Sequence, residues 1–130
     1  MNPIDLLPIE SVTHDGPTAV MRLAIALQGL PKDGGSLAAQ LYVHKVRGIV
    51  NDTRRDPLAL YLTARVGAQV IVGGSLIEVE HEDFHYQMLT PEWVEHFLCD
   101  LVSGEHPLIE GEPSIGDVRA VDAFASLARS

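Results

Sequence analysis

One stretch decides the fold class: residues 69–80 read QVIVGGSLIEVE. Two runs rich in β-branched residues flank Gly73-Gly74-Ser75, and this pattern is typical of a β-hairpin. After the polar turn at 81–83, residues 84–89 supply a third strand. We therefore predict a small antiparallel meander with strands at 69–72, 76–80 and 84–89.

Three helices are expected before the meander. Segment 18–28 is apolar nearly all round, with Pro17 suited to a first helical turn and Gly29 to a helix end. Positions 21, 23, 25 and 27 also alternate, so a strand is an open alternative to the favoured helix. Ser36 is expected to cap a second helix that runs to about Val50. Residues 51–55 then form a polar link.

The third helix carries the clearest boundary signals in the chain. Asp56 is a capping residue, Pro57 suits the first helical position, and Gly67 suits the residue after the last turn. The body, 58–66, is apolar on almost every side. Such a helix is normally central and buried.

After the meander, Thr90-Pro91 is expected to cap a fourth helix. Its apolar face would consist of Trp93, Val94, Phe97, Leu98 and Leu101. Residues 104–113 look like a link, and Ser114 is expected to cap a terminal helix over 114–130. The inward side chains of that helix would be Val118, Val121, Phe124 and Leu127.

The whole pattern predicts one α+β domain over residues 1–130: helices, a small antiparallel meander, then C-terminal helices. Residues 1–14 are expected to be an irregular lead. The composition, 46% hydrophobic and 21% charged, is that of a globular protein and excludes a disordered one. With Cys99 alone, no internal disulfide can form. We expect a cytoplasmic protein that does not enter the membrane.

The net charge of −9 is unevenly distributed along the chain. Residues 1–67 carry seven Lys or Arg and six acidic side chains, whereas residues 68–130 carry two Arg and twelve acidic side chains. Like charges so concentrated repel one another unless a partner or counterions offset them. The later half therefore suits a basic ligand and disfavours free nucleic acid. A solvated acidic surface that only maintains solubility is the simpler alternative.

From this charge distribution we expect a small acidic interaction or regulatory protein, without enzymatic activity or cofactor, that binds a basic protein partner. One form of this hypothesis is a nucleic-acid mimic that inhibits a DNA-binding protein. The separated charges also allow a homodimer, positive half against negative half. The residues expected to bind the partner are Glu78, Glu80, Glu82, Asp83, Glu92 and Glu95.

A metal-binding or enzymatic function is an alternative. Imidazole and carboxylate groups together can hold a divalent ion, so His81, Asp83 and His85 are candidate ligands. The expected turn at 81–83 counts against a shared side for the three residues. On the fourth helix, His96 and Asp100 are four residues apart and can meet, which we interpret as a surface ion pair.

A second alternative is a winged-helix DNA-binding regulator. Its basic cluster would be Lys45, Arg47, Arg54 and Arg55, around the link between the second and third helices. The helix that would have to read the bases, 58–66, is mostly apolar, and apolar groups cannot read base edges. The arginines are therefore expected to balance the acidic half of the molecule.

Two motifs lie within residues 46–109: PLAxYL at 57–62 followed by Gly67, and LTPxxVxxF at 89–97 followed by GxxPL at 104–108. In these motifs the chain resembles a set of small actinobacterial proteins of unknown function. It departs from them at Asp56, where a cysteine is expected, and at Leu60, where a basic residue is expected. The resemblance implies a common origin and carries no activity.

Overall fold

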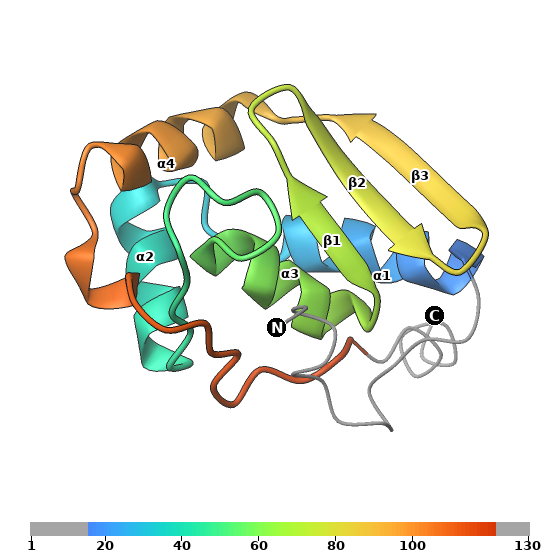
Figure 1. Cartoon of the computed structure of the whole chain (residues 1–130), viewed down its shortest axis with the longest axis horizontal. Coiled ribbons are helices and arrows are strands. Elements are labelled where there is room, and N and C mark those ends of the chain that lie inside the picture. Colours follow the sequence, from blue (N-terminus) through green and yellow to red (C-terminus); the bar gives the residue numbers. More distant parts are fainter. Residues whose placement is uncertain (1–15, 122–130) are drawn as a thin grey trace.

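The computed structural model describes residues 16–121. Figure 1 shows a three-stranded sheet lying across two helices, with two further helices to one side. The α+β class predicted above is confirmed. In chain order the elements are α1 (Gly16–Gln28), α2 (Gly34–Val43), α3 (Pro57–Val66), β1 (Gln69–Val72), β2 (Leu76–His81), β3 (Phe84–Leu89), α4 (Glu92–Val102) and the 3-10 turn η3 (Pro107–Ile109). Among the helices in this range, none combines the length and the apolar character that a bilayer crossing requires.

The sheet is the predicted meander, antiparallel in the order β1-β2-β3. Because side chains alternate between faces, the register sorts them into two sets. Val70, Val79 and Tyr86 lie on the inner face, which packs on α1 and α3. Glu78 and Glu80 lie on the outer face, opposite Gln87 and His85 in the register.

Helix α3 is the centre of the core. Nine of its ten residues are buried, and it packs against α1, α2 and β1. Asp56 caps it, with Oδ1 accepting from the Ala59 N–H at 2.8 Å. Gly67, at φ 79°, ends it in the left-handed region and donates its N–H to Thr63 O. The predicted boundaries of this helix are confirmed.

Helix α1 settles the choice that the sequence left open between helix and strand at 18–28. The segment is helical, and it buries Ala19, Leu23, Ala26 and Leu27 against α3 and the sheet. A strand would have placed positions 23 and 27 on one face but 26 on the other. The helix brings all four to the core.

Helix α2 differs from the prediction at both ends. Its N-cap is Asp33 and not Ser36, because the helix begins earlier and the Asp33 carboxylate accepts from the Ser36 N–H at 3.0 Å. The helix ends at Val43 and not near Val50. Lys45 takes a left-handed φ of 62°, which stops the helix, and the buried Val46 then enters the core.

Residues 47–48 and 109–114 pair through backbone hydrogen bonds, and we call these two segments the clasp. Arg47 and Ser114 exchange backbone hydrogen bonds at 3.1 and 2.9 Å. Gly48 donates to Ile109 O and accepts from the Gly111 N–H, both at 2.9 Å. The sequence pattern predicts a helix through the first segment, and a link to residue 113 followed by a helix cap at Ser114 in the second. Their pairing joins parts of the chain about sixty residues apart, which no local pattern reports.

The fourth helix is confirmed, with Val94, Phe97 and Leu101 buried on its inner face. Its cap is wrong: Pro91 holds the N-cap position, and the Thr90 hydroxyl donates to Gly73 O at 2.7 Å instead. The predicted terminal helix is wrong over 114–121, where Ser114 belongs to the clasp and Gly116 takes φ 56°. Phe124, Leu127 and the lead 1–14 lie outside the described residues.

Gly48 provides a direct test of the clasp. A Cβ at this position would lie 2.3 Å from Arg55 O and 2.6 Å from Pro57 N, both backbone atoms that cannot easily yield. We expect Gly48→Ala to lower the free energy of unfolding by about 2 kcal/mol or more. Gly74→Ala is the matched control, because a Cβ there meets nothing within 4 Å. Urea denaturation of both variants measures the effect, and equal stabilities would show that the clasp can open without cost.

Candidate functional site

The acids on the outer sheet face are already engaged with neighbours. Arg54 reaches Glu80 with both terminal nitrogens, at 3.3 and 3.4 Å. Glu78 accepts from Gln87 at 2.8 Å and lies 3.1 Å from His85 Nε2. The hydrogen bond from Gln87, with that from His85, lowers the pKa of Glu78. These two predicted partner-binding residues thus belong to a polar network within the molecule.

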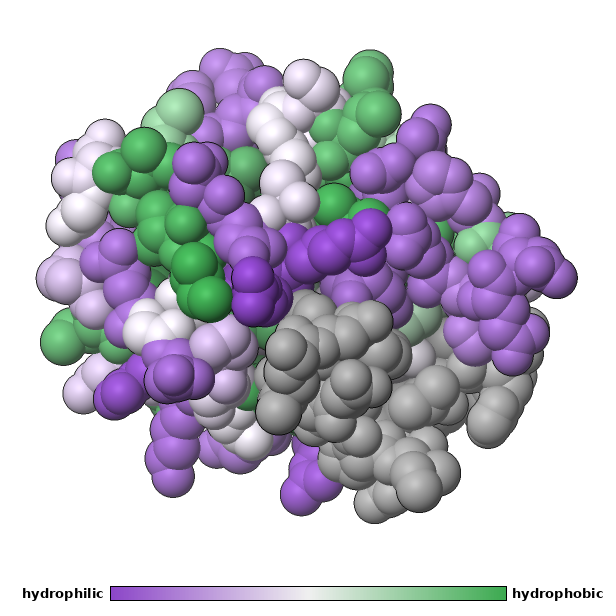
Figure 2. Space-filling view, viewed as in Figure 1, coloured by the Kyte–Doolittle hydropathy of each residue, from purple (hydrophilic) through white to green (hydrophobic). Residues whose placement is uncertain are grey.

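The other four predicted partner-binding acids fall into two groups. Glu82 and Asp83 form the turn between β2 and β3, and Glu92 and Glu95 lie on α4 beyond the far end of β3. A six-residue strand is about 20 Å long, so the two groups are separated by at least that order of distance. The six acids therefore do not form one compact patch. In the view of Figure 2, polar residues cover the side of the sheet and a band of apolar residues lies toward α2.

The predicted basic cluster is divided in the same way. Arg54 is paired with Glu80, and Arg55 Nη2 lies 2.9 Å from Asp52 Oδ2. Arg47 belongs to the clasp and Lys45 lies just before it, and both line a cavity with Tyr42 and Leu108. Helix α3, the candidate recognition helix, is buried on nearly every side and has no free face to enter a groove of DNA. The expectation that these arginines balance the acidic half is met by Arg54, whose partner Glu80 lies in that half, whereas Arg55 pairs with Asp52 of the first half.

The candidate metal ligands of the hairpin do not meet. In the sheet register His81 faces Phe84 and His85 faces Glu80, which puts the two imidazoles on opposite faces, with Asp83 in the turn between them. The expected pair of His96 and Asp100 is also wrong. His96 lies 3.6 Å from Glu92, and Asp100 lies near His106 instead. Within 16–121, the residues that do gather as possible ligands are Asp100, Glu105 and His106.

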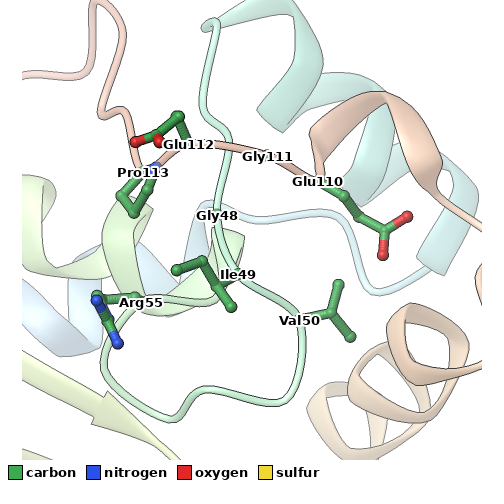
Figure 3. A pocket seen from close by; sticks show the side chains of 8 residues that line it. All are labelled: Gly48, Ile49, Val50, Arg55, Glu110, Gly111, Glu112 and Pro113. Carbon is green, nitrogen blue, oxygen red and sulfur yellow. The ribbon is translucent and has the colours of Figure 1, made fainter.

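Figure 3 shows a cavity between the loop 48–55 and the clasp residues 110–113, with a volume of about 630 Å³. Ile49 and Val50 form its apolar side, and Glu110 lies across from Arg55. The Arg55 guanidinium is held by Asp52, and neither His nor Cys is found among the described residues of the lining. This cavity lies where the two clasp segments meet at Gly48, and its lining offers few groups that could bind or react with a ligand.

A second cavity, of about 460 Å³, combines charge with apolar walls; we call it the α4 pocket. It lies between α4, the loop 51–56 and the β1–β2 turn. Val72, Leu98, Leu101 and Val102 form its apolar part. Asp52, Asp56 and Glu95 contribute three carboxyl groups to the lining, and the described residues that line it include no Lys, Arg or His. The exposed thiol of Cys99 is also there, without a neighbouring base in the lining.

Asp56 is the unusual member of this set. Its residue is only 3% exposed, and burial raises the pKa of its carboxyl to about 7, against the lowering effect of hydrogen bonds from the Ala59 and Leu58 N–H groups. The nearby charge of Asp52 adds to the rise. A buried carboxyl that titrates near neutrality in a cavity is a recognised mark of a binding site, although a helix cap alone also requires this residue.

Sequence reasoning found Asp56 as a cap and Glu95 as a surface acid but did not place them together. The Asp56-Pro57 pattern indicates where α3 starts but not which residues cover that start. Comparisons with known proteins do not add to this placement, since no family model, no curated protein and no solved structure matches the chain. The resemblance to actinobacterial proteins stays a prediction.

Asp56 predicts a specific dependence of stability on pH. Its folded-state pKa of about 7 exceeds the ordinary 3.8, so the folded chain retains a proton that the unfolded chain releases. This contribution to stability is complete below pH ~4 and is lost as the pH rises to about 7. Asn caps helices as well as Asp and cannot ionise. At pH 8 we expect the free energy of unfolding of Asp56→Asn to exceed that of the wild type by a few kcal/mol. The variant should therefore unfold at a higher denaturant concentration.

The difference between the two proteins should shrink steadily as the pH is lowered from 8 to 5. Denaturation curves at three pH values measure it. Asp83→Asn, in the β2–β3 turn, controls for the loss of one carboxylate and should keep the wild-type pH dependence. If Asp56→Asn also follows the wild type in parallel at every pH, the carboxyl of Asp56 is ionised in the folded protein and our assignment is wrong.

Proposed function

We propose that this protein is a non-catalytic interaction module for a basic protein partner, and that the α4 pocket receives a Lys or Arg side chain of that partner. The observation that carries the proposal is the lining of this pocket: two carboxyl groups from the loop 51–56, one from α4, and no basic side chain among the described residues. The acidic binding surface expected from the sequence is thus confined to the α4 pocket, which is smaller and more specific.

The walls of the α4 pocket suit such a side chain. Val72, Leu98 and Leu101 offer apolar surface to its aliphatic stem, and long basic side chains commonly bury the stem while the charged end finds a polar partner. Glu95 has no ion pair within 16–121, so it is available. Asp52 is partly neutralised by Arg55, which leaves Glu95 and Asp56 as the principal partners.

Asp56 would respond to an arriving cation. A positive charge within a few ångströms favours the ionised carboxylate, so binding would lower the raised pKa of Asp56 and release a proton near pH 7. The net charge of −9 would speed the encounter with a basic partner at low ionic strength. Both effects weaken when salt screens the charges.

The test uses n-butylammonium, a lysine side chain without its backbone, added to isotope-labelled full-length protein. We expect the amide signals of Gly73, Gly74 and Cys99 to shift in a saturable way, and n-butanol, which has the same alkyl chain without charge, to leave them in place. The double variant Asp56→Asn, Glu95→Gln should weaken binding by about tenfold, or 1.4 kcal/mol. Raising the salt concentration should weaken binding to the wild type.

The matched control is Glu82→Gln, Asp83→Asn, which removes two acids of the β2–β3 turn and leaves the α4 pocket unchanged. It should bind n-butylammonium as the wild type does. A pull-down of basic proteins from lysate with the same three proteins extends the test to a whole partner. Retention that depends on the turn acids and not on Asp56 and Glu95 would place the docking surface on the hairpin and reject the pocket.

A further inference from the structure

Three potential metal ligands converge where the end of α4 meets the start of α2. Asp100 lies in the last turn of α4, and Glu105 and His106 follow in the bend that leads to η3. One ligand atom from each lies within 4.8 Å of the others. The bend is held by backbone hydrogen bonds, with Glu105 N–H donating to Asp100 O at 3.0 Å and Gly104 at φ 78°. The arrangement is thus fixed by the backbone and is distinct from the α4 pocket.

The imidazole of His106 is positioned by packing. Its ring stacks on Phe97, with centroids 5.5 Å apart and planes 25° from parallel, and its side chain is only 15% exposed. The Nε2 atom is buried and makes no hydrogen bond to any described residue, and Asp100 Oδ2 lies 3.9 Å away. A buried ring nitrogen without a partner is uncommon and calls for an explanation. The distance is too long for a hydrogen bond.

Gly34, the first residue of α2, borders the cluster on another side. A Cβ on Gly34 would lie 2.9 Å from Asp100 Oδ2 and 3.9 Å from His106 Nε2. Any larger residue would therefore occupy the space beside the two ligand atoms. Glycine leaves this space open at the junction of two helices.

We propose that Asp100, Glu105 and His106 bind one divalent transition-metal ion, of the kind represented by Zn²⁺ or Mn²⁺. An imidazole nitrogen with two carboxylate oxygens suits such ions. Two metal–ligand bonds of about 2.1 Å can span roughly 4 Å, so the separation of Asp100 and His106 admits an ion between them. Glu105, which is exposed, can move inward to complete the set. The ion would join the end of α4 to the bend, beside the first residue of α2, and water would fill its remaining positions.

The experiment is a calorimetric titration of the full-length protein with ZnCl₂, together with the same titration of Asp100→Asn and His106→Gln. We expect one ion per chain, and a loss of affinity of roughly tenfold or more in each variant. His96→Gln is the matched control, because His96 lies on α4 beside Glu92 and outside the cluster. It should bind as the wild type does.

A second measurement locates the ion. Substoichiometric MnCl₂ should broaden the amide signal of Gly34 in the wild type and spare it in Asp100→Asn. This reading holds even if His106→Gln proves poorly folded, since Asp100 is partly exposed and Asn preserves its shape. Absence of heat at millimolar Zn²⁺, or binding and broadening unaffected by Asp100→Asn, would show that Asp100 and His106 form only a long ion pair. Either result would leave the proposed function of the α4 pocket unaffected.

Discussion

The near-complete burial of α3 is the constraint on which the rest of the molecule depends. A helix with nine of ten residues buried must be surrounded, and α1, α2 and the sheet supply the surroundings. Its first turn is then inside the protein as well, so the N–H groups that every helix leaves unpaired at its start cannot reach water. The carboxyl of Asp56 satisfies them and is buried with them. The raised pKa of Asp56 therefore follows from the core, before any ligand is considered.

Burial of α3 also determines where the charges can lie. Acidic side chains are confined to the elements around the core, and Arg54 and Arg55, next to the start of α3, each meet an acid within the molecule. Among the described residues, much of the net negative charge is left on the β2–β3 turn, on α4, on the bend after it and on the clasp. Helix α4 borders the α4 pocket and also contributes Asp100 to the group of possible metal ligands. Both candidate cation sites therefore lie along α4.

Local patterns in the sequence were sufficient for the meander, for α3 with both its boundaries and for the apolar face of α4, because each rests on neighbours in the chain. They failed where distant segments meet. Arg47 and Gly48 leave the expected helix because their backbone groups hydrogen-bond to residues 109–114 in the clasp. Ser114 is taken up by the same clasp and starts no helix. The same distinction applies to the candidate sites. Asp56 was recognisable as a cap and Glu95 as an acid from local sequence. Their shared cavity, and the approach of His106 to Asp100, depend on tertiary structure alone.

The two proposed cation sites lie on one helix and differ in what they select. The α4 pocket offers carboxyl groups and apolar walls, which suit an ammonium or guanidinium on a carbon stem. The cluster at the end of α4 adds an imidazole nitrogen, which is a good ligand for a transition-metal ion. Glu95 and Asp100 are five residues apart, about 8 Å along a helix. Two unit charges at that distance interact by about 0.5 kcal/mol in water, and physiological salt reduces this further. Occupation of one site should therefore alter the other only slightly, and the helix can serve both.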